Sequence, residues 1–192
     1  MINCMMKNLI PLFFIGVLSV GCKDQDKELP AEEISDNSSQ AIEEGPDLSG
    51  FEYNLSGDSA FITKCTRVGQ VIVPNVIEDL AVIGITDNAF FGNIGMTSVV
   101  LPDTLDSIGN SAFRGCINIT DIIIPPNVTS IGISAFSGCR KLKTVKFLGH
   151  APPNAKYIFK DAPATIYFDP GKEGWDKSFG GRPIKPMKDF PG

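Results

Sequence analysis

The side chains with the most intrinsic reactivity in this sequence are its five cysteines and its single histidine. Cys116 and Cys139 stand 23 residues apart. In an oxidising compartment two such thiols can form a disulfide if the fold brings them together. Both also fit the alternative of small buried apolar residues, which we favour. The sequence has no Cys-x-x-Cys motif and no second histidine, so it does not predict a zinc site.

His150 and the acidic residues are the other candidates for chemistry. His150 lies in a Gly- and Pro-rich stretch at 149–153 that is typical of a turn. A Cys139–His150 pair would combine a nucleophile with a base, but a surface or capping histidine is the interpretation that we favour. The carboxylates are scattered, and no Gly-rich loop of the phosphate-binding kind is present. We therefore expect no catalytic residues, no metal and no cofactor.

Length and charge limit the classes of protein that the chain can belong to. With 192 residues, 43% of them hydrophobic and 20% charged, it suits one folded domain or a short array of repeats. The net charge of −5 offers no general attraction for nucleic acid. We expect a folded protein without a nucleic-acid partner.

The N-terminus has the pattern of a targeting segment. Residues 9–20 are mostly apolar and follow Lys7, but the run is shorter than the roughly 20 residues that span a bilayer. Residues 1–21 are therefore typical of a secretory signal peptide. The sequence Ser-Val-Gly-Cys at 19–22 resembles a bacterial lipobox, although Ser19 stands where that motif prefers Leu. The resemblance implies cleavage before Cys22 and lipidation of its thiol, and the alternative is an ordinary secreted protein.

The segment 22–50 has the composition of a tether. After Cys22 it carries nine acidic residues against two lysines, so it buries too little apolar surface to fold and should be disordered. Its Lys23-Asp24 start is similar to the signal that sends some Bacteroidetes lipoproteins to the outer leaflet. We expect an exported chain, lipid-anchored to the bacterial outer membrane, and the resemblance extends this to exposure at the surface. Residues 51–192 are nearly neutral, with 13 acidic and 14 basic side chains.

A repeat of 23 residues runs through the nearly neutral part of the chain. Its clearest marker is an Ala-Phe pair, with phenylalanines at Phe90, Phe113 and Phe136, and Phe159 continues the series. An isoleucine stands five residues before each of the first three phenylalanines and a glycine two residues after. Alternating strands follow, and their inward positions are Val99 and Leu101, Ile122 and Ile124, and Val145 and Phe147.

This pattern predicts how successive repeats stack. Alternation that ends at Pro102 and Pro125 indicates one short strand per repeat. Stacked repeats then form a parallel sheet in which like side chains lie over one another, so the phenylalanines become a continuous internal ladder. We expect the Ala-Phe segment to be a tight helical or 3₁₀ turn on the convex side, with the following glycine at positive φ.

The three repeats at 82–149 resemble the BspA-type, or treponemal, leucine-rich repeat, and the resemblance extends over about residues 51–186. It implies a β-rich leucine-rich-repeat solenoid of the α/β class with a short parallel sheet. It also implies an N-terminal capping module at 51–81, which contains a first strand at 71–73. A degenerate fourth repeat and a C-terminal cap should follow at 150–192. In that cap, Trp175 and Phe179 should cover the end of the core.

The outward-facing strand positions are the candidate ligand-binding site. Leucine-rich repeats characteristically use their concave face for partners, and apolar residues there suggest a recognition surface. The β-propensity of Val and Ile is an alternative reason for their presence. The candidate residues are Ile72, Ser98, Val100, Asp121, Ile123, Thr144, Lys146 and Tyr167.

A run of basic residues near the last repeats has two interpretations. It could meet an anionic glycan or an acidic protein, or it could be an ordinary solvated face, which we favour. The residues are Arg140, Lys141, Lys143, Lys146, Lys156 and Lys160.

The resemblance implies a non-enzymatic surface module that adheres to a protein of the host matrix, a host cell or another bacterium. The only membrane contact expected is the lipid on Cys22. The alternative function is a glycan-binding accessory lipoprotein in nutrient capture, and an undetected hydrolase is a more distant third class.

Overall fold

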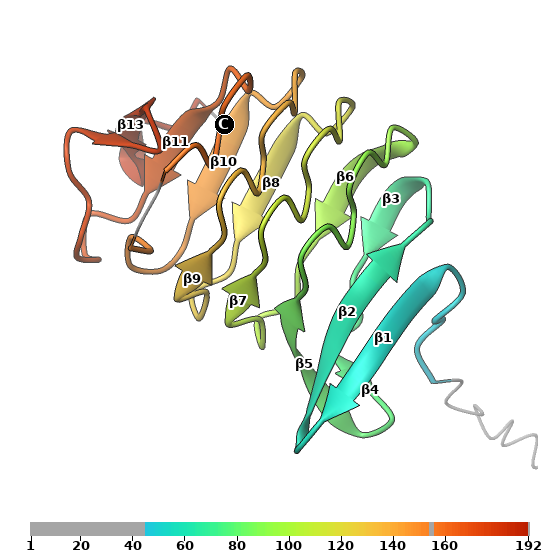
Figure 1. The fold of residues 1–192 in the computed structure, drawn as a ribbon. Coiled ribbons are helices and arrows are strands. Elements are labelled where there is room, and N and C mark those ends of the chain that lie inside the picture. Colours follow the sequence, from blue (N-terminus) through green and yellow to red (C-terminus); the bar gives the residue numbers. More distant parts are fainter. Residues whose placement is uncertain (1–44, 154–155, 192) are drawn as a thin grey trace, which may run out of the picture. The chain divides into compact units, whose positions relative to one another are not determined.

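The strands of the repeats lie in two rows that run side by side along the array (Figure 1). The protein is represented by a computed structural model that describes residues 45–153 and 156–191. The predicted signal peptide 1–21, the lipidated Cys22 and all of the tether 22–50 except its last six residues lie outside the described residues.

The first row consists of the strands that the alternating pattern predicts. It begins with β3 (Gly69–Ile72), which pairs in parallel with β6 (Met96–Val100). It continues with four strands that pair in parallel in chain order: β8 (Asp121–Ile124), β10 (Thr144–Phe147), β11 (Thr165–Phe168) and β13 (Arg182–Pro186). The short strand β12 (Ser178–Phe179) pairs antiparallel with β13 and forms the edge of this sheet.

The second row was not predicted, because the sequence indicated only one strand per repeat. Its repeat strands β7 (Ser107–Ile108) and β9 (Ser130–Ile131) are two residues long, which is too short to give an alternating pattern. They pair in parallel with each other and with β5. The N-terminal part of the row is β1 (Phe51–Ser56) and β2 (Ser59–Cys65), which form a hairpin, then β4 (Val76–Ile77) and β5 (Leu80–Ile85).

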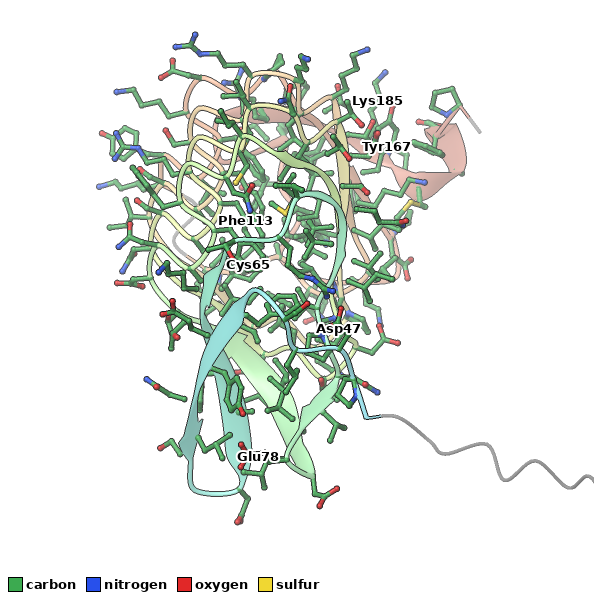
Figure 2. The ribbon with its side chains drawn as sticks, turned by 90° about the vertical axis from the view of Figure 1, so that its right-hand side faces the viewer. Asp47, Cys65, Glu78, Phe113, Tyr167 and Lys185 are labelled. Carbon is green, nitrogen blue, oxygen red and sulfur yellow. The ribbon has the colours of Figure 1, made fainter. Side chains whose placement is uncertain are left out.

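The predicted phenylalanine ladder is confirmed. The ring centroids of Phe90 and Phe113 lie 4.6 Å apart, those of Phe113 and Phe136 lie 5.2 Å apart, and those of Phe136 and Phe159 lie 5.6 Å apart. All four rings are fully buried and stacked. Figure 2 shows Phe113 between the turns on one side of the solenoid and the strands on the other. Because one phenylalanine covers the next, no single repeat can bury its own ring.

The Ala-Phe segments are hydrogen-bonded turns. The described part of the chain has no α-helix, and its one helical element is the 3₁₀ helix η1 (Met187–Asp189). Each turn also bonds to the next repeat. The N–H of Phe90 donates to the carbonyl of Ala112, and the N–H of Phe113 donates to that of Ala135. The turns therefore form a third hydrogen-bonded ladder, which satisfies backbone groups that a helix would otherwise satisfy internally.

The two ends of the core are covered by residues outside the regular repeats. At the N-terminal end, Asn93 Nδ2 donates to the Arg67 carbonyl at 2.8 Å. This hydrogen bond connects the segment that follows β2 to the first repeat. At the C-terminal end, the rings of Trp175 and Phe179 pack edge-on against Phe147 at 5.0 and 5.3 Å. This contact confirms the covering role predicted for the two aromatic residues.

Candidate binding site

Three apolar side chains stand in a row on the outward face of the first strand row. Ile72 on β3 is in register with Val100 on β6, and Ile123 holds the equivalent place on β8. They are 59, 47 and 51% exposed, although their neighbours along each strand are buried. We call Ile72, Val100 and Ile123 the strand stripe. The strands hold these side chains outward because successive residues of a strand point to opposite faces.

Two hollows lie along the strand stripe, and Val100 borders both. The larger has a volume of about 520 Å³ and lies between Ile72, Val100 and the prolines that follow their strands, Pro74 and Pro102. The smaller has a volume of about 280 Å³ and lies between Val100 and Ile123. The stripe is therefore a ridge with a hollow on each side of Val100, which a complementary apolar surface could fill.

The polar members of the predicted site lie beside the strand stripe. Thr144 is in register with Asp121 on the neighbouring strand, and Ser98 is in register with Gln70. Asp121 is exposed, whereas Ser98 and Thr144 are half-buried. The structure thus brings the predicted residues from β6, β8 and β10 onto one face.

The predicted availability of Tyr167 is wrong. Tyr167 does lie in register with Lys146, at the outward position of β11, but it is only 6% exposed. The ring of Phe190, from the chain beyond η1, meets it edge-on with centroids 5.1 Å apart. The ammonium group of Lys146 lies over the same Phe190 ring. A C-terminal segment that has no place in the 23-residue pattern therefore covers this end of the site.

The cysteine thiols of the repeats are buried and engaged. The Cys116 thiol donates to the Phe90 carbonyl at 3.1 Å, and the Cys139 thiol donates to the Phe113 carbonyl at the same distance. Both cysteines are free, which agrees with the buried interpretation rather than with a disulfide. Burial raises the pKa of each thiol to about 12. Neither thiol is ionised near neutral pH, so neither has the character of a catalytic nucleophile.

His150 acts in the C-terminal cap. Its Nδ1 accepts a hydrogen bond from the backbone N–H of Glu173 at 3.1 Å, and the N–H of Ala151 donates to the Glu173 carbonyl. The predicted capping interpretation of His150 is confirmed by these contacts.

The described residues contain no cluster of three or more His, Cys, Asp or Glu side chains with the geometry of a metal site. Within the same residues, no helix has the length and apolar character of a membrane span.

Sequence reasoning missed a second exposed apolar surface, on the turn side of the repeats. Val68, Phe91, Ile94 and Ile117 are all exposed there. A signal for it was present, because Phe91 and Ile94 stand where the next repeats carry Arg114 and Ile117 and then Ser137 and Arg140. The predicted basic run begins at this surface, since Arg140 lines one of its hollows.

Residues 83–166 match the family model described as the BspA type leucine rich repeat region, in six copies. The repeat array is a BspA-type leucine-rich repeat. The resemblance inferred from the Ala-Phe pairs is thereby confirmed, and the parallel strands at 23-residue spacing agree with it. Leucine-rich repeats of this kind are scaffolds for binding, and their extended surfaces carry the recognition.

Three solved structures are similar to this chain. A leucine rich repeat protein of T. pallidum is 20% identical, with 65% of this chain and 85% of that chain covered and a TM-score of 0.33. A leucine rich cell surface protein of Faecalibacterium prausnitzii is 22% identical, with 62 and 44% covered and a TM-score of 0.46. A leucine-rich repeat protein of Bacteroides ovatus is 19% identical, with 65 and 55% covered and a TM-score of 0.30. This chain therefore spans about half the length of the last two. No curated protein matches the sequence.

Proposed function

We propose that this BspA-type protein is a non-enzymatic binding module that recognises a protein partner through the strand stripe. The observation that carries the proposal is the row of Ile72, Val100 and Ile123, three half-exposed apolar side chains at equivalent positions of successive strands in the first strand row. Solvent-exposed aliphatic side chains in a contiguous row gain free energy when a partner covers them. Ser98, Asp121 and Thr144 beside the row would supply the polar rim that protein interfaces have.

A protein partner fits the strand stripe better than a glycan does. Sugar rings bind well against an exposed aromatic face, and the one aromatic residue predicted at an outward strand position, Tyr167, is covered by Phe190. The exposed members of the stripe are aliphatic. An aliphatic row suits apolar side chains of another protein, for which adhesion to a host or bacterial surface is the proposed setting.

We also propose that the module is held on the bacterial outer membrane. The support is the sequence alone: the signal-like residues 1–21, the lipobox-like sequence that ends at Cys22, and the acidic tether up to residue 50. The folded part then comprises the capping module at 51–81, the repeats at 82–149 and the terminal cap at 150–192. Intact-mass measurement of the protein from bacterial membranes should show an acylated Cys22, and a mature chain with an unmodified thiol would contradict the anchor.

Binding through the strand stripe is tested with two matched double variants. Val100→Glu combined with Ile123→Glu places two charges on the stripe, whereas Leu55→Glu combined with Ile133→Glu places two charges on exposed aliphatic positions away from it. Each variant and the unmodified chain are assayed against immobilised matrix proteins and a glycan array, with circular dichroism as a check of folding. We expect the stripe variant alone to lose protein binding.

Two results would contradict the proposal. Unchanged protein binding by the folded stripe variant would show that the strand stripe is not the site. Binding to the glycan array without binding to any protein would favour the alternative, a glycan-binding lipoprotein that captures nutrients.

A further inference from the structure

A trough without side chains on its floor runs along the turn side of the repeats. Gly92, Gly115 and Gly138 all have positive φ, of 67°, 75° and 73°, which explains why each repeat has glycine there. The glycines of successive repeats lie against one another: a Cβ on Gly115 would be 3.6 Å from the Gly92 Cα, and one on Gly138 would be 3.8 Å from the Gly115 Cα. The floor of the trough is therefore continuous backbone.

The walls of the trough are two columns of side chains. The residues directly after each ladder phenylalanine form one wall, and the residues four positions after it form the other. A hollow of about 580 Å³ at the N-terminal end and one of about 290 Å³ further along share Phe91 and Gly92, so the trough is continuous. The first wall is Phe91, Arg114 and Ser137, and the second is Ile94, Ile117 and Arg140.

The exposed large side chains of the N-terminal half of the trough are mainly apolar, although Lys64 also lines it. Val68, Phe91 and Ile94 line the larger hollow, and each is more than half exposed. Such side chains in a contiguous group gain free energy when an apolar ligand covers them.

The second half of the trough is cationic. Arg114 and Arg140 line the smaller hollow, and Asp161 is the single acidic residue that lines it. The ion pairs among the described residues are Lys64–Glu52 and Arg67–Asp47, so neither arginine is neutralised by a carboxylate there. An unneutralised pair of guanidinium groups favours a carboxylate ligand.

We propose that this trough binds an extended segment of a partner protein in which apolar side chains are followed by carboxylates. The apolar side chains would cover Val68, Phe91 and Ile94, and the carboxylates would meet Arg114 and Arg140. An extended segment can follow the trough from one repeat to the next. Successive ladder rings are 4.6 and 5.2 Å apart, and each residue of an extended chain spans about 3.3 Å, so one to two residues of the segment pass each repeat. An anionic polysaccharide would leave the apolar half uncovered, and the folded part of a second copy, residues 51–192, is nearly neutral.

The trough and the strand stripe share no residue, so this inference goes beyond the proposed function and is tested independently of it. Random short peptides displayed on phage are selected on the full chain and counter-selected on the Phe91→Glu variant. We expect the enriched peptides to combine apolar residues with Asp or Glu. Their binding is then measured by fluorescence anisotropy against trough variants and matched controls.

The variants separate the two halves of the trough. Phe91→Glu and Arg140→Glu should each weaken peptide binding about tenfold or more. Ile133→Glu and Lys143→Glu, at exposed positions that do not line either hollow, should leave the affinity within about twofold. Circular dichroism shows whether each variant is folded, and Val100→Glu should bind the peptides normally.

Several outcomes would overturn the inference. Enriched peptides that lack acidic residues, or that bind Phe91→Glu as well as the original chain, would do so. Binding of chondroitin sulfate that depends on Arg140 but not on Phe91 would assign the trough to a polysaccharide instead. Concentration-dependent dimerisation in sedimentation experiments that Phe91→Glu abolishes would assign it to a second copy.

Discussion

The ammonium nitrogen of Lys146 lies 3.3 Å from the centroid of the Phe190 ring, above the outward face of β10. The same ring meets Tyr167 edge-on, with centroids 5.1 Å apart. One side chain near the C-terminus thus contacts two residues predicted to bind a ligand. The consequence is that the freely exposed part of the strand face ends at Ile123, because the next two outward positions, Lys146 and Tyr167, are contacted by Phe190 of the terminal cap.

The Lys146–Phe190 contact should be measurable as a coupling energy. We expect a double-mutant cycle of Lys146→Met and Phe190→Leu to give about 0.5–2 kcal/mol of coupling in the free energy of unfolding, as found for cation–π pairs. Urea denaturation of the four proteins supplies the values. A coupling energy of zero would mean that Phe190 does not cover Lys146 in solution.

Truncation within the phenylalanine ladder should be costly. Phe113 is fully buried between Phe90 and Phe136, so Phe113→Ala should lower the free energy of unfolding by about 3–5 kcal/mol. Phe91→Ala is the matched control, because Phe91 is also a phenylalanine but is exposed on the surface. This substitution should cost about 1 kcal/mol or less. Equal midpoints of urea denaturation for the two variants would contradict the ladder as the main source of stability.

The close approach of successive repeats makes Gly132 intolerant of a side chain. A Cβ at this position would lie 2.4 Å from the Asn110 nitrogen and 2.6 Å from the Gly109 carbonyl carbon, which are backbone atoms that cannot move freely. Gly132→Ala should therefore destabilise the protein by about 1–3 kcal/mol. Gly45→Ala, which would have no neighbour within 4 Å, is the control. Thermal denaturation of both variants distinguishes the outcomes, and a Gly132→Ala protein as stable as its control would exclude the tight spacing.

Alkaline pH should weaken the fold through the buried thiols. Burial raises the pKa of Cys116 and Cys139 from the ordinary 9.0 to about 12. Between these values the unfolded chain loses thiol protons that the folded chain keeps. The free energy of unfolding is therefore unaffected by the thiols below pH 9 and falls as the pH rises toward 12. The expected slope is about 1.4 kcal/mol per pH unit for each thiol.

The double variant Cys116→Ala, Cys139→Ala isolates this effect, because lysines and tyrosines titrate in both proteins. We expect the urea-derived stability of the original chain to fall more steeply above pH 9 than that of the double variant. Parallel slopes would show that the thiols are accessible to water in the folded state.

The sequence predicted those parts of the fold that depend on contacts between equivalent positions. Phe90, Phe113 and Phe136 recur every 23 residues, and in a stacked array each contacts its own equivalent in the next repeat. Periodicity alone therefore identified the ladder, the parallel strands and the positive-φ glycine. The outward strand positions Val100 and Ile123 followed from the same logic, because alternation along a strand decides which side chains leave the core.

The sequence by itself thus determined the stacking of the repeats and which faces their side chains occupy. Only the tertiary structure decided what remains uncovered on those faces. Phe190 closes over Tyr167, and Val68 borders the hollow beside Phe91. Neither Phe190 nor Val68 belongs to the 23-residue pattern. The exposure of a residue depends on every neighbour that packs against it, and a periodic pattern predicts only the neighbours that are themselves periodic.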